Sequence, residues 1–167
     1  MTVIEEGEMK KFHKEGLLHR AVAVVLYNKN KEILLTQRSK KKIGEGLWET
    51  VGTHVRTGES AINSGCRCLK NEIGVEGAYL RFIGNFSYFA QLGEYAENEV
   101  VDVLVGEWND EIKPNKEEVE NFKWIQLNEL KKETESKNPQ YALWLLKGSE
   151  LFYKEFKEIA SKPKPIS

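Results

Sequence analysis

The pattern of apolar and polar positions in the first third of the chain is typical of β-structure. Residues 21–27 form an aliphatic, β-branched run that predicts a buried strand. Polar residues at 28–31 predict a turn, so residues 32–38 are expected to return as a second strand and complete a hairpin. The lysine- and glycine-rich segment 39–46 is expected to form a loop, and residues 48–52 a short strand.

The middle of the chain changes to a helical period. Four apolar residues recur at intervals of three or four positions, namely Ile62, Cys66, Leu69 and Ile73. This spacing predicts a helix over residues 59–73. Gly74 follows directly, and glycine readily adopts the left-handed conformation with which many helices end.

The next segments again favour strands. Residues 79–92 and 99–108 are expected to be strands joined through residues 93–98. A charged connection over residues 113–120 precedes a short strand at residues 122–126.

Two further helices are expected at the end of the chain. Asn128 is suited to cap a short helix, and a final helix is expected from near Pro139 to about residue 160. Strands around one central helix, followed by a terminal helix, predict a mixed sheet with helices packed on it. The fold class is therefore α/β or α+β, in one domain over residues 1–167.

Composition and charge exclude several classes of protein. Hydrophobic residues make up 40% of the 167 residues, which is too many for a disordered chain. The 25 basic and 26 acidic residues give a net charge of −1, without the basic excess typical of nucleic-acid or membrane-surface binders. Residues 1–11 lack the apolar segment of a signal peptide, and residues 21–27 are too few to span a bilayer. Cys66 and Cys68 would point to nearly opposite sides of a helix, so a reducing, cytoplasmic location is expected.

Residues 52–75 resemble the signature of the Nudix superfamily, a family of α/β/α sandwich proteins that act on diphosphates. Six residues match the signature at the required spacing, namely Glu59, Arg67, Leu69, Glu72, Gly74 and Val75. Three positions depart from it, namely Thr53, Cys68 and Asn71. An ordinary amphipathic helix is the alternative, but six matches in register favour the Nudix interpretation.

The spacing of the signature has a physical purpose. Positions 68, 71 and 72 share one face of a helix, where carboxylates would gather Mg²⁺ beside the phosphates of a substrate. Only Glu72 carries a carboxylate here. Glu72 alone would not recruit metals as the hydrolases of the superfamily do.

A second group of metal-ligand residues is spread along the chain. His13, His19 and His54 are its only histidines, and Glu97 and Glu99 would emerge on the same face of an extended segment. Three imidazoles and two carboxylates would suit Zn²⁺ or Mn²⁺. By composition alone, scattered surface or core histidines and solvated glutamates would be the simpler interpretation.

Residues 10–150 are similar to the type 1 isopentenyl-diphosphate isomerases, a branch of the Nudix superfamily. The similarity rests on the segments Leu-His-Arg-Ala at 18–21, Gly-Thr-His-Val at 52–55, Glu-Asn-Glu-Val at 97–100 and Tyr-Ala-Leu-Trp at 141–144. It implies that the three histidines, Glu97 and Glu99 bind one metal, and that Glu72 binds a second, substrate-borne Mg²⁺.

The same resemblance implies the remaining site residues. Arg38 and one of the lysines at 40–42, assigned to Lys41, match positions that bind the diphosphate, and Arg67 is a third candidate cation. The catalytic candidates are Glu99, Glu72, Glu59 and Tyr88. A strand tyrosine is, however, more often a packing residue, and the lysines can equally form a solvated loop. Three aromatic residues are candidates for an apolar pocket or for the core, namely Trp48, Phe86 and Trp144.

One departure from the isomerase pattern concerns the chemistry itself. Moving a double bond requires two proton-transfer groups, and the family uses a cysteine and a glutamate. The glutamate matches Glu99, but Gly52 occupies the cysteine position and Val55 follows where the family has proline. We expect a small-molecule diphosphate substrate and three ranked functions. These are metal-dependent hydrolysis, isomerisation with a replaced acid, and diphosphate binding without turnover.

Overall fold

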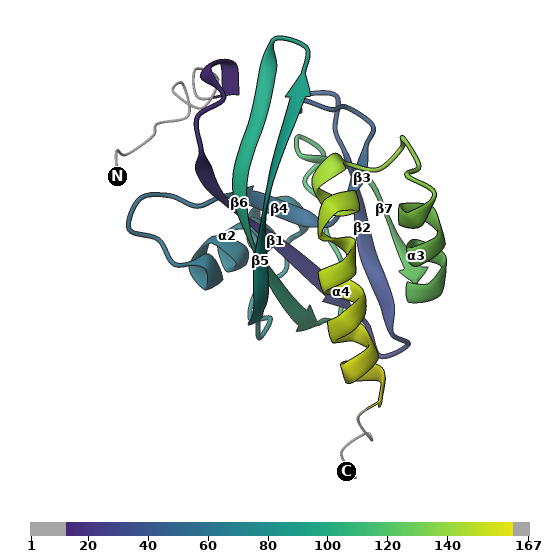
Figure 1. Cartoon of the computed structure of the whole chain (residues 1–167). Helices are drawn as coiled ribbons and strands as arrows, with labels where there is room; N and C mark the ends of the chain where they lie inside the picture. Colours follow the sequence, from purple (N-terminus) through teal and green to yellow (C-terminus); the bar gives the residue numbers. More distant parts are fainter. Residues whose placement is uncertain (1–12, 162–167) are drawn as a thin grey trace.

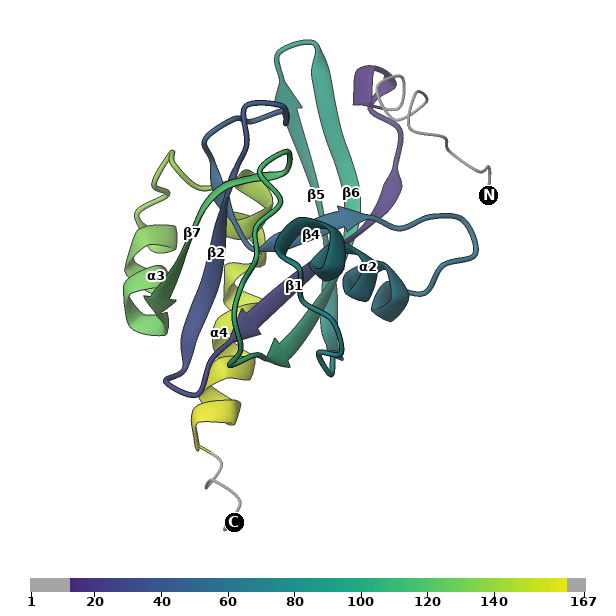
Figure 2. The same cartoon turned by 180° about the vertical axis from the view of Figure 1, so that it is seen from behind.

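The computed structural model describes residues 13–161, which form a mixed seven-stranded sheet with helices on both faces (Figures 1 and 2). The strands are β1 (His19–Tyr27), β2 (Glu32–Arg38), β3 (Trp48–Glu49), β4 (Val51–His54), β5 (Arg81–Leu92), β6 (Tyr95–Glu107) and β7 (Val119–Gln126). The helices are α2 (Ala61–Ile73), α3 (Leu127–Glu135) and α4 (Leu143–Ser161). No helix within this part of the chain is long and apolar enough to cross a membrane.

Strand β1 separates two hydrophobic cores because successive side chains of a strand point to opposite faces. Ala21, Ala23 and Val25 belong to the core beneath α3 and α4. Val22, Val24 and Leu26 belong to the core beneath α2. The continuous apolar run of β1 therefore reflects burial on both faces, and the molecule is the predicted α/β/α sandwich (Figure 1).

The pairing of β1 with its neighbours positions the polar residues at its N-terminal end. β1 runs parallel to β6, with His19 opposite Glu99. On its other side β1 pairs antiparallel with β4, with Ala21 opposite His54. β5 continues the sheet beyond β6, with Tyr88 opposite Glu99. Since cross-strand partners point to the same face, these side chains converge at one end of the sheet.

Helix α2 ends at Ile73 as predicted and begins at Ala61, two residues after the predicted start at Glu59. The Ser60 side chain caps its N-terminus by accepting a hydrogen bond from the backbone N–H of Asn63. Gly74 ends it in a left-handed conformation, with φ of 67°, and donates to the carbonyls of the last turn. Local capping at residues 60 and 74 therefore sets both ends of α2, independently of its tertiary contacts.

Two of the predicted elements are wrong in position. The expected strand 48–52 is two strands, because β3 pairs with β2 and β4 pairs with β1 on either side of Thr50. β6 begins at Tyr95, so the expected connection 93–98 is a tight hairpin turn. Both Glu97 and Glu99 consequently lie within a strand.

The helix ends in the last third of the chain also differ from the expectation. Asn128 lies inside α3, whose N-cap position is Gln126 without a side-chain cap. α4 begins at Leu143 and not near Pro139. The backbone before it is engaged by β3, because Gln140 accepts from the N–H of Trp48 at 2.7 Å and Ala142 donates to the carbonyl of Trp48 at 2.9 Å.

Candidate active site

A cavity of about 750 Å³ opens at the end of the sheet where the polar residues of β1, β4 and β6 converge. Residues of α2 and of the loop between β2 and β3 complete its wall, together with Trp144 of α4. Two groups of charged side chains face it. The metal cluster consists of His13, His19, His54, Tyr88, Glu97 and Glu99. The phosphate-end cluster consists of Arg38, Lys42, Glu49, Glu72 and Glu118.

The three histidines of the metal cluster lie against one another. One nitrogen of each lies within 4.8 Å of the corresponding nitrogens of the other two. Nδ1 of His13 lies 3.2 Å from the Ala96 carbonyl, and Nδ1 of His19 lies 2.8 Å from the Leu17 carbonyl. A carbonyl only accepts, so each Nδ1 is a donor, and each Nε2 can serve as a metal ligand once it is deprotonated.

Glu99 is the acidic centre of the metal cluster. Its Oε1 lies 3.0 Å from Nε2 of His19 and 3.2 Å from Nε2 of His54. Burial alone would raise the pKa of Glu99, but its hydrogen bonds to the two histidines hold that pKa well below the ordinary value. Burial alone would lower the pKa of His19, but its hydrogen bond to Glu99 outweighs this effect and the pKa of His19 is raised.

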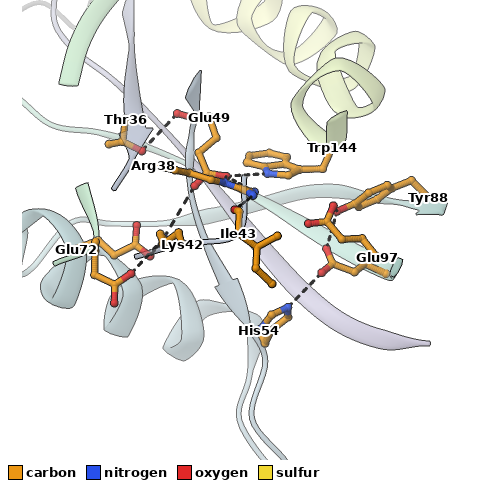
Figure 3. Close-up of polar contacts among 12 residues, drawn as sticks. Thr36, Arg38, Lys42, Ile43, Glu49, His54, Glu72, Tyr88, Glu97 and Trp144 are labelled. Atoms are coloured by element: carbon orange, nitrogen blue, oxygen red, sulfur yellow. Dashed lines mark hydrogen bonds and ion pairs between the residues drawn. The ribbon is translucent and has the colours of Figure 1, made fainter. Parts of the chain in front are cut away.

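Tyr88 joins the two glutamates of the metal cluster. Its hydroxyl lies 2.7 Å from Oε2 of Glu97 and 3.1 Å from Oε2 of Glu99 (Figure 3). Burial and the two neighbouring carboxylates raise the pKa of Tyr88, which therefore remains a neutral hydroxyl.

The donor atoms of the metal cluster fit a divalent transition metal. Imidazole nitrogens and carboxylate oxygens are the ligands that Zn²⁺ and Mn²⁺ accept, and the carbonyls behind His13 and His19 orient the rings. Burial lowers the pKa of His13, which keeps that ring in the neutral form that binds metals.

In the phosphate-end cluster, two cations are surrounded by carboxylates (Figure 3). Nε and Nη2 of Arg38 lie 2.8 Å and 2.7 Å from Oε2 of Glu49. Nζ of Lys42 lies 3.1 Å from Glu72, 3.2 Å from Glu118 and 4.0 Å from Glu49. Burial disfavours both cations, but the carboxylates raise the pKa of Arg38 and of Lys42.

Glu72 has an acidity unlike that of the other carboxylates. Burial raises its pKa to about 7; Lys42 opposes this shift and Glu49 adds to it. A carboxylate that titrates near neutral pH is suited to accept a proton from water.

Three candidates from the sequence are engaged by ion pairs with neighbouring side chains. The side chain of Lys41 is exposed and pairs with Glu117, so Lys42, and not Lys41, is the lysine that faces the cavity. Arg67 lines the cavity but is held by Glu59 at 2.9 Å. Hydrogen bonds from Arg67 and Ser64 lower the pKa of Glu59 to about 2. These contacts give Glu59 a structural role at the start of α2.

The positions that depart from the family patterns have distinct surroundings. Cys68 is buried in the core beneath α2 and was wrongly expected to face the cavity. The other three α2 residues expected there do line the cavity, namely Arg67, Asn71 and Glu72. Gly52 lines the cavity, and a Cβ added there would lie 4.0 Å from the Trp144 ring and 3.1 Å from the Val22 carbonyl.

Two residues of the site were missed from the sequence. Glu49 and Glu118 contact Arg38 and Lys42 through strand pairings that no local pattern reveals. The sequence signal for Glu49 was a charged residue between Trp48 and Thr50 in a predicted short strand. Trp144 lines the cavity, whereas Trp48 and Phe86 pack against the core beneath α3 and α4.

Comparison with known proteins identifies relatives of this chain. The NUDIX domain model matches residues 17–145. An isopentenyl-diphosphate Delta-isomerase of Rhodobacter capsulatus is 34% identical over 148 residues, which cover 86% of this chain and 84% of the relative. The isopentenyl-diphosphate Delta-isomerase of Dinoroseobacter shibae is 35% identical over 138 residues, with coverages of 80% and 78%.

Solved structures show the same fold at lower identity. A MutT protein from Methanosarcina mazei superposes with a TM-score of 0.68 at 19% identity, covering 89% of this chain and 99% of the other. An Ap4A hydrolase from C. elegans superposes with a TM-score of 0.60 at 21% identity, covering 86% and 99%. The chain belongs to the Nudix family, and within it is similar to proteins named isopentenyl-diphosphate Delta-isomerase.

Proposed function

We propose that this protein is a metal-dependent enzyme that hydrolyses the diphosphate bond of an organic diphosphate of the isopentenyl-diphosphate class. The observation that carries the proposal is the convergence of three histidines, with nitrogens within 4.8 Å of one another, beside the cations of the phosphate-end cluster in one cavity. The substrate class is taken from the names of the relatives.

The His/Glu ligands would hold a divalent metal, which when bound polarises phosphate oxygens and offsets their charge. Arg38 and Lys42 would bind the phosphates by charge-assisted hydrogen bonds. Glu72, with its pKa of about 7, would accept the proton of the attacking water as the bond between the two phosphates breaks. An organic monophosphate and inorganic phosphate would be the products.

Gly52 favours hydrolysis over isomerisation. Hydrolysis needs one base and no acid at position 52, whereas the isomerases of this branch use a cysteine there. Hydrogen bonds lower the pKa of Glu99 and of Glu59, which makes both weak bases, whereas the pKa of Glu72 is raised to about 7. Glu72 is therefore the base that we assign.

A second candidate function is isomerisation with Tyr88 as the replacing acid. The Tyr88 hydroxyl faces the cavity within 3.1 Å of Glu99, the residue that matches the family's other proton-transfer group. The names of the relatives favour the same reaction.

Incubation with isopentenyl diphosphate distinguishes the two functions. Phosphorus NMR and mass spectrometry would follow the reaction with Mg²⁺, Mn²⁺ or Zn²⁺, and again after chelation. Hydrolysis gives isopentenyl monophosphate and phosphate, and Glu72→Gln is expected to slow it about 10²–10⁴-fold. Conversion to dimethylallyl diphosphate without phosphate release would overturn the hydrolytic proposal in favour of the second candidate. Turnover that persists after complete metal removal would overturn both.

A further inference from the structure

Glu49 occupies a central position between the phosphate end of the cavity and its aromatic wall. It is a buried carboxylate, 5% exposed, on the short strand β3. Its Oε2 accepts from Nε of Arg38 at 2.8 Å and from Nε1 of Trp144 at 3.1 Å (Figure 3). Its Oε1 lies 4.0 Å from Nζ of Lys42. Glu49 thus contacts both cations to which the proposed function assigns the phosphates.

The contacts of Arg38 limit the donors that it can offer to a phosphate. A guanidinium has five N–H groups. The Nε group donates to Glu49, Nη2 faces the same oxygen at 2.7 Å, and Nη1 donates to the Ile43 carbonyl at 2.8 Å. Glu49 therefore engages the side of the guanidinium that could otherwise bind two phosphate oxygens in parallel.

The charges of the phosphate-end cluster do not favour a bare anion. Arg38 and Lys42 contribute two positive charges, and Glu49, Glu72 and Glu118 contribute three negative charges within 4.0 Å of them. With all five groups ionised the sum is −1. A diphosphate entering this cluster meets an excess of negative charge, and the interactions are strengthened because Glu49 and Glu72 are buried.

We propose that Glu49 is a specificity-determining residue that makes diphosphate binding depend on a divalent cation. This inference rests on the proposed function, in that Arg38 and Lys42 bind the phosphates. Glu49 holds the guanidinium in place and offsets its charge, so that a diphosphate binds only when a cation accompanies it. Removing the charge of Glu49 brings the net charge of the phosphate-end cluster to zero. It also weakens the hydrogen bonds between residue 49 and the two parallel N–H donors of Arg38.

Glu49→Gln is the direct test, because glutamine keeps the size of the side chain and an oxygen that accepts from Trp144. Glu111→Gln is the matched control for net charge. Glu111 is exposed, and its ion pair with Lys113 joins two exposed side chains outside the cavity. Arg38→Gln tests the phosphate site itself.

Isothermal titration with inorganic diphosphate, with Mg²⁺ and after chelation, gives a readout that does not depend on turnover. Without metal, Glu49→Gln is expected to bind diphosphate at least about ten-fold more tightly than the wild type or Glu111→Gln. With Mg²⁺, the wild type and Glu49→Gln are expected to differ by less than this. A thermal unfolding curve with one transition establishes that the variant is folded.

The possible failures are distinguishable. Equal metal-free binding by Glu49→Gln and the wild type, with Arg38→Gln abolishing binding in Mg²⁺, would overturn the role of Glu49 and leave the phosphate site intact. Binding in Mg²⁺ that is unchanged in Arg38→Gln would instead overturn the proposed phosphate site, and this inference with it. If Glu49→Gln does not fold, Glu49→Asp should retain the metal requirement; metal-free binding as tight as its Mg²⁺-supported binding would overturn the role of Glu49.

Discussion

The metal cluster and the phosphate-end cluster line the same cavity but are built differently. The metal cluster draws His19, His54, Glu99 and Tyr88 from neighbouring strands, where backbone pairing fixes their spacing. The phosphate-end cluster draws its cations from the end of β2 and the following loop, and its carboxylates from β3, α2 and the segment before β7. Strand register organises the first cluster, whereas ion pairing organises the second.

This difference has a functional consequence. The histidine nitrogens already lie together, so a metal would need little rearrangement of the sheet to bind. The cations of the other cluster are already paired, so a phosphate must replace carboxylate contacts before it binds. Substitutions in the first cluster should therefore act on metal affinity, and substitutions in the second on diphosphate affinity.

The largest expected effect comes from Gly52, which lies in the wall shared by the two clusters. Gly52→Cys supplies the proton-transfer group that the isomerases use at this position, and should raise isomerisation of isopentenyl diphosphate by up to about 10²–10⁴-fold. The backbone there needs no positive φ, although the Val22 carbonyl must yield slightly to the new Cβ. Gly52→Ala is the control, since it adds the Cβ without the thiol. Equal rates for the two variants would refute the expected role of the thiol.

The next largest effect is expected in the metal cluster. His19→Gln removes one of the proposed ligands, and the affinity for Mn²⁺ or Zn²⁺ should fall by at least about 100-fold, because replacing even indirect partners of metal ligands costs about 10–100-fold. Isothermal titration measures this directly. Lys42→Met serves as the comparison and should leave metal affinity nearly unchanged. If His19→Gln binds Mn²⁺ or Zn²⁺ as tightly as the wild type, the metal binds at another site.

A smaller effect separates two adjacent lysines of the loop. Lys42→Met should weaken binding of magnesium diphosphate about ten-fold, equivalent to about 1.4 kcal/mol, because Lys42 faces the cavity. Lys41→Met should change it less than two-fold, since Lys41 pairs with Glu117 at the surface. The opposite order would assign the phosphate-binding role to Lys41.

The smallest effect concerns stability outside both clusters. The pKa of Glu59 is about 2 in the folded protein, below its ordinary value of 4.5. A lowered carboxyl pKa contributes stability above pH 4.5, and this contribution is lost as the pH falls toward 2. Glu59→Gln should therefore lower the free energy of unfolding by about 1–2 kcal/mol at pH 7 and by less at pH 3. Denaturant titration at both pH values measures it. A loss that is equal at both would exclude the ion pair with Arg67 as its source.

The fold was predictable from the sequence where local pattern and burial agree. The apolar run of β1 and the period of α2, with Gly74 at its end, gave correct elements because they depend on nearby residues. Asn128 failed as a cap because the chain passes directly from β7 into α3 at Gln126. The start of α4 failed because the residues before it pair with Trp48, a contact remote in sequence.

The two clusters also differ in how far the sequence predicts them. The ligand set proposed for the metal cluster was predicted from a family resemblance, and the His19–Glu99 register explains how two of its members come together. The direction of Lys41 and Lys42 could not be predicted, because a loop has no period that assigns side chains to a face. Glu49 was missed because its partners Arg38 and Trp144 become neighbours only when β2, β3 and α4 are assembled.

The most direct test of a shared cavity uses Mn²⁺ as both ligand and probe. Paramagnetic Mn²⁺ relaxes the phosphorus nuclei of a bound diphosphate strongly at short range, so a non-hydrolysable isopentenyl diphosphate analogue can be followed by phosphorus NMR. A metal held by the histidines beside Arg38 and Lys42 should give strong relaxation in the wild-type protein. The protein-dependent part of this relaxation should disappear in His19→Gln and weaken in Lys42→Met. Relaxation in His19→Gln equal to that of the wild type would contradict the assignment of metal and diphosphate to one site.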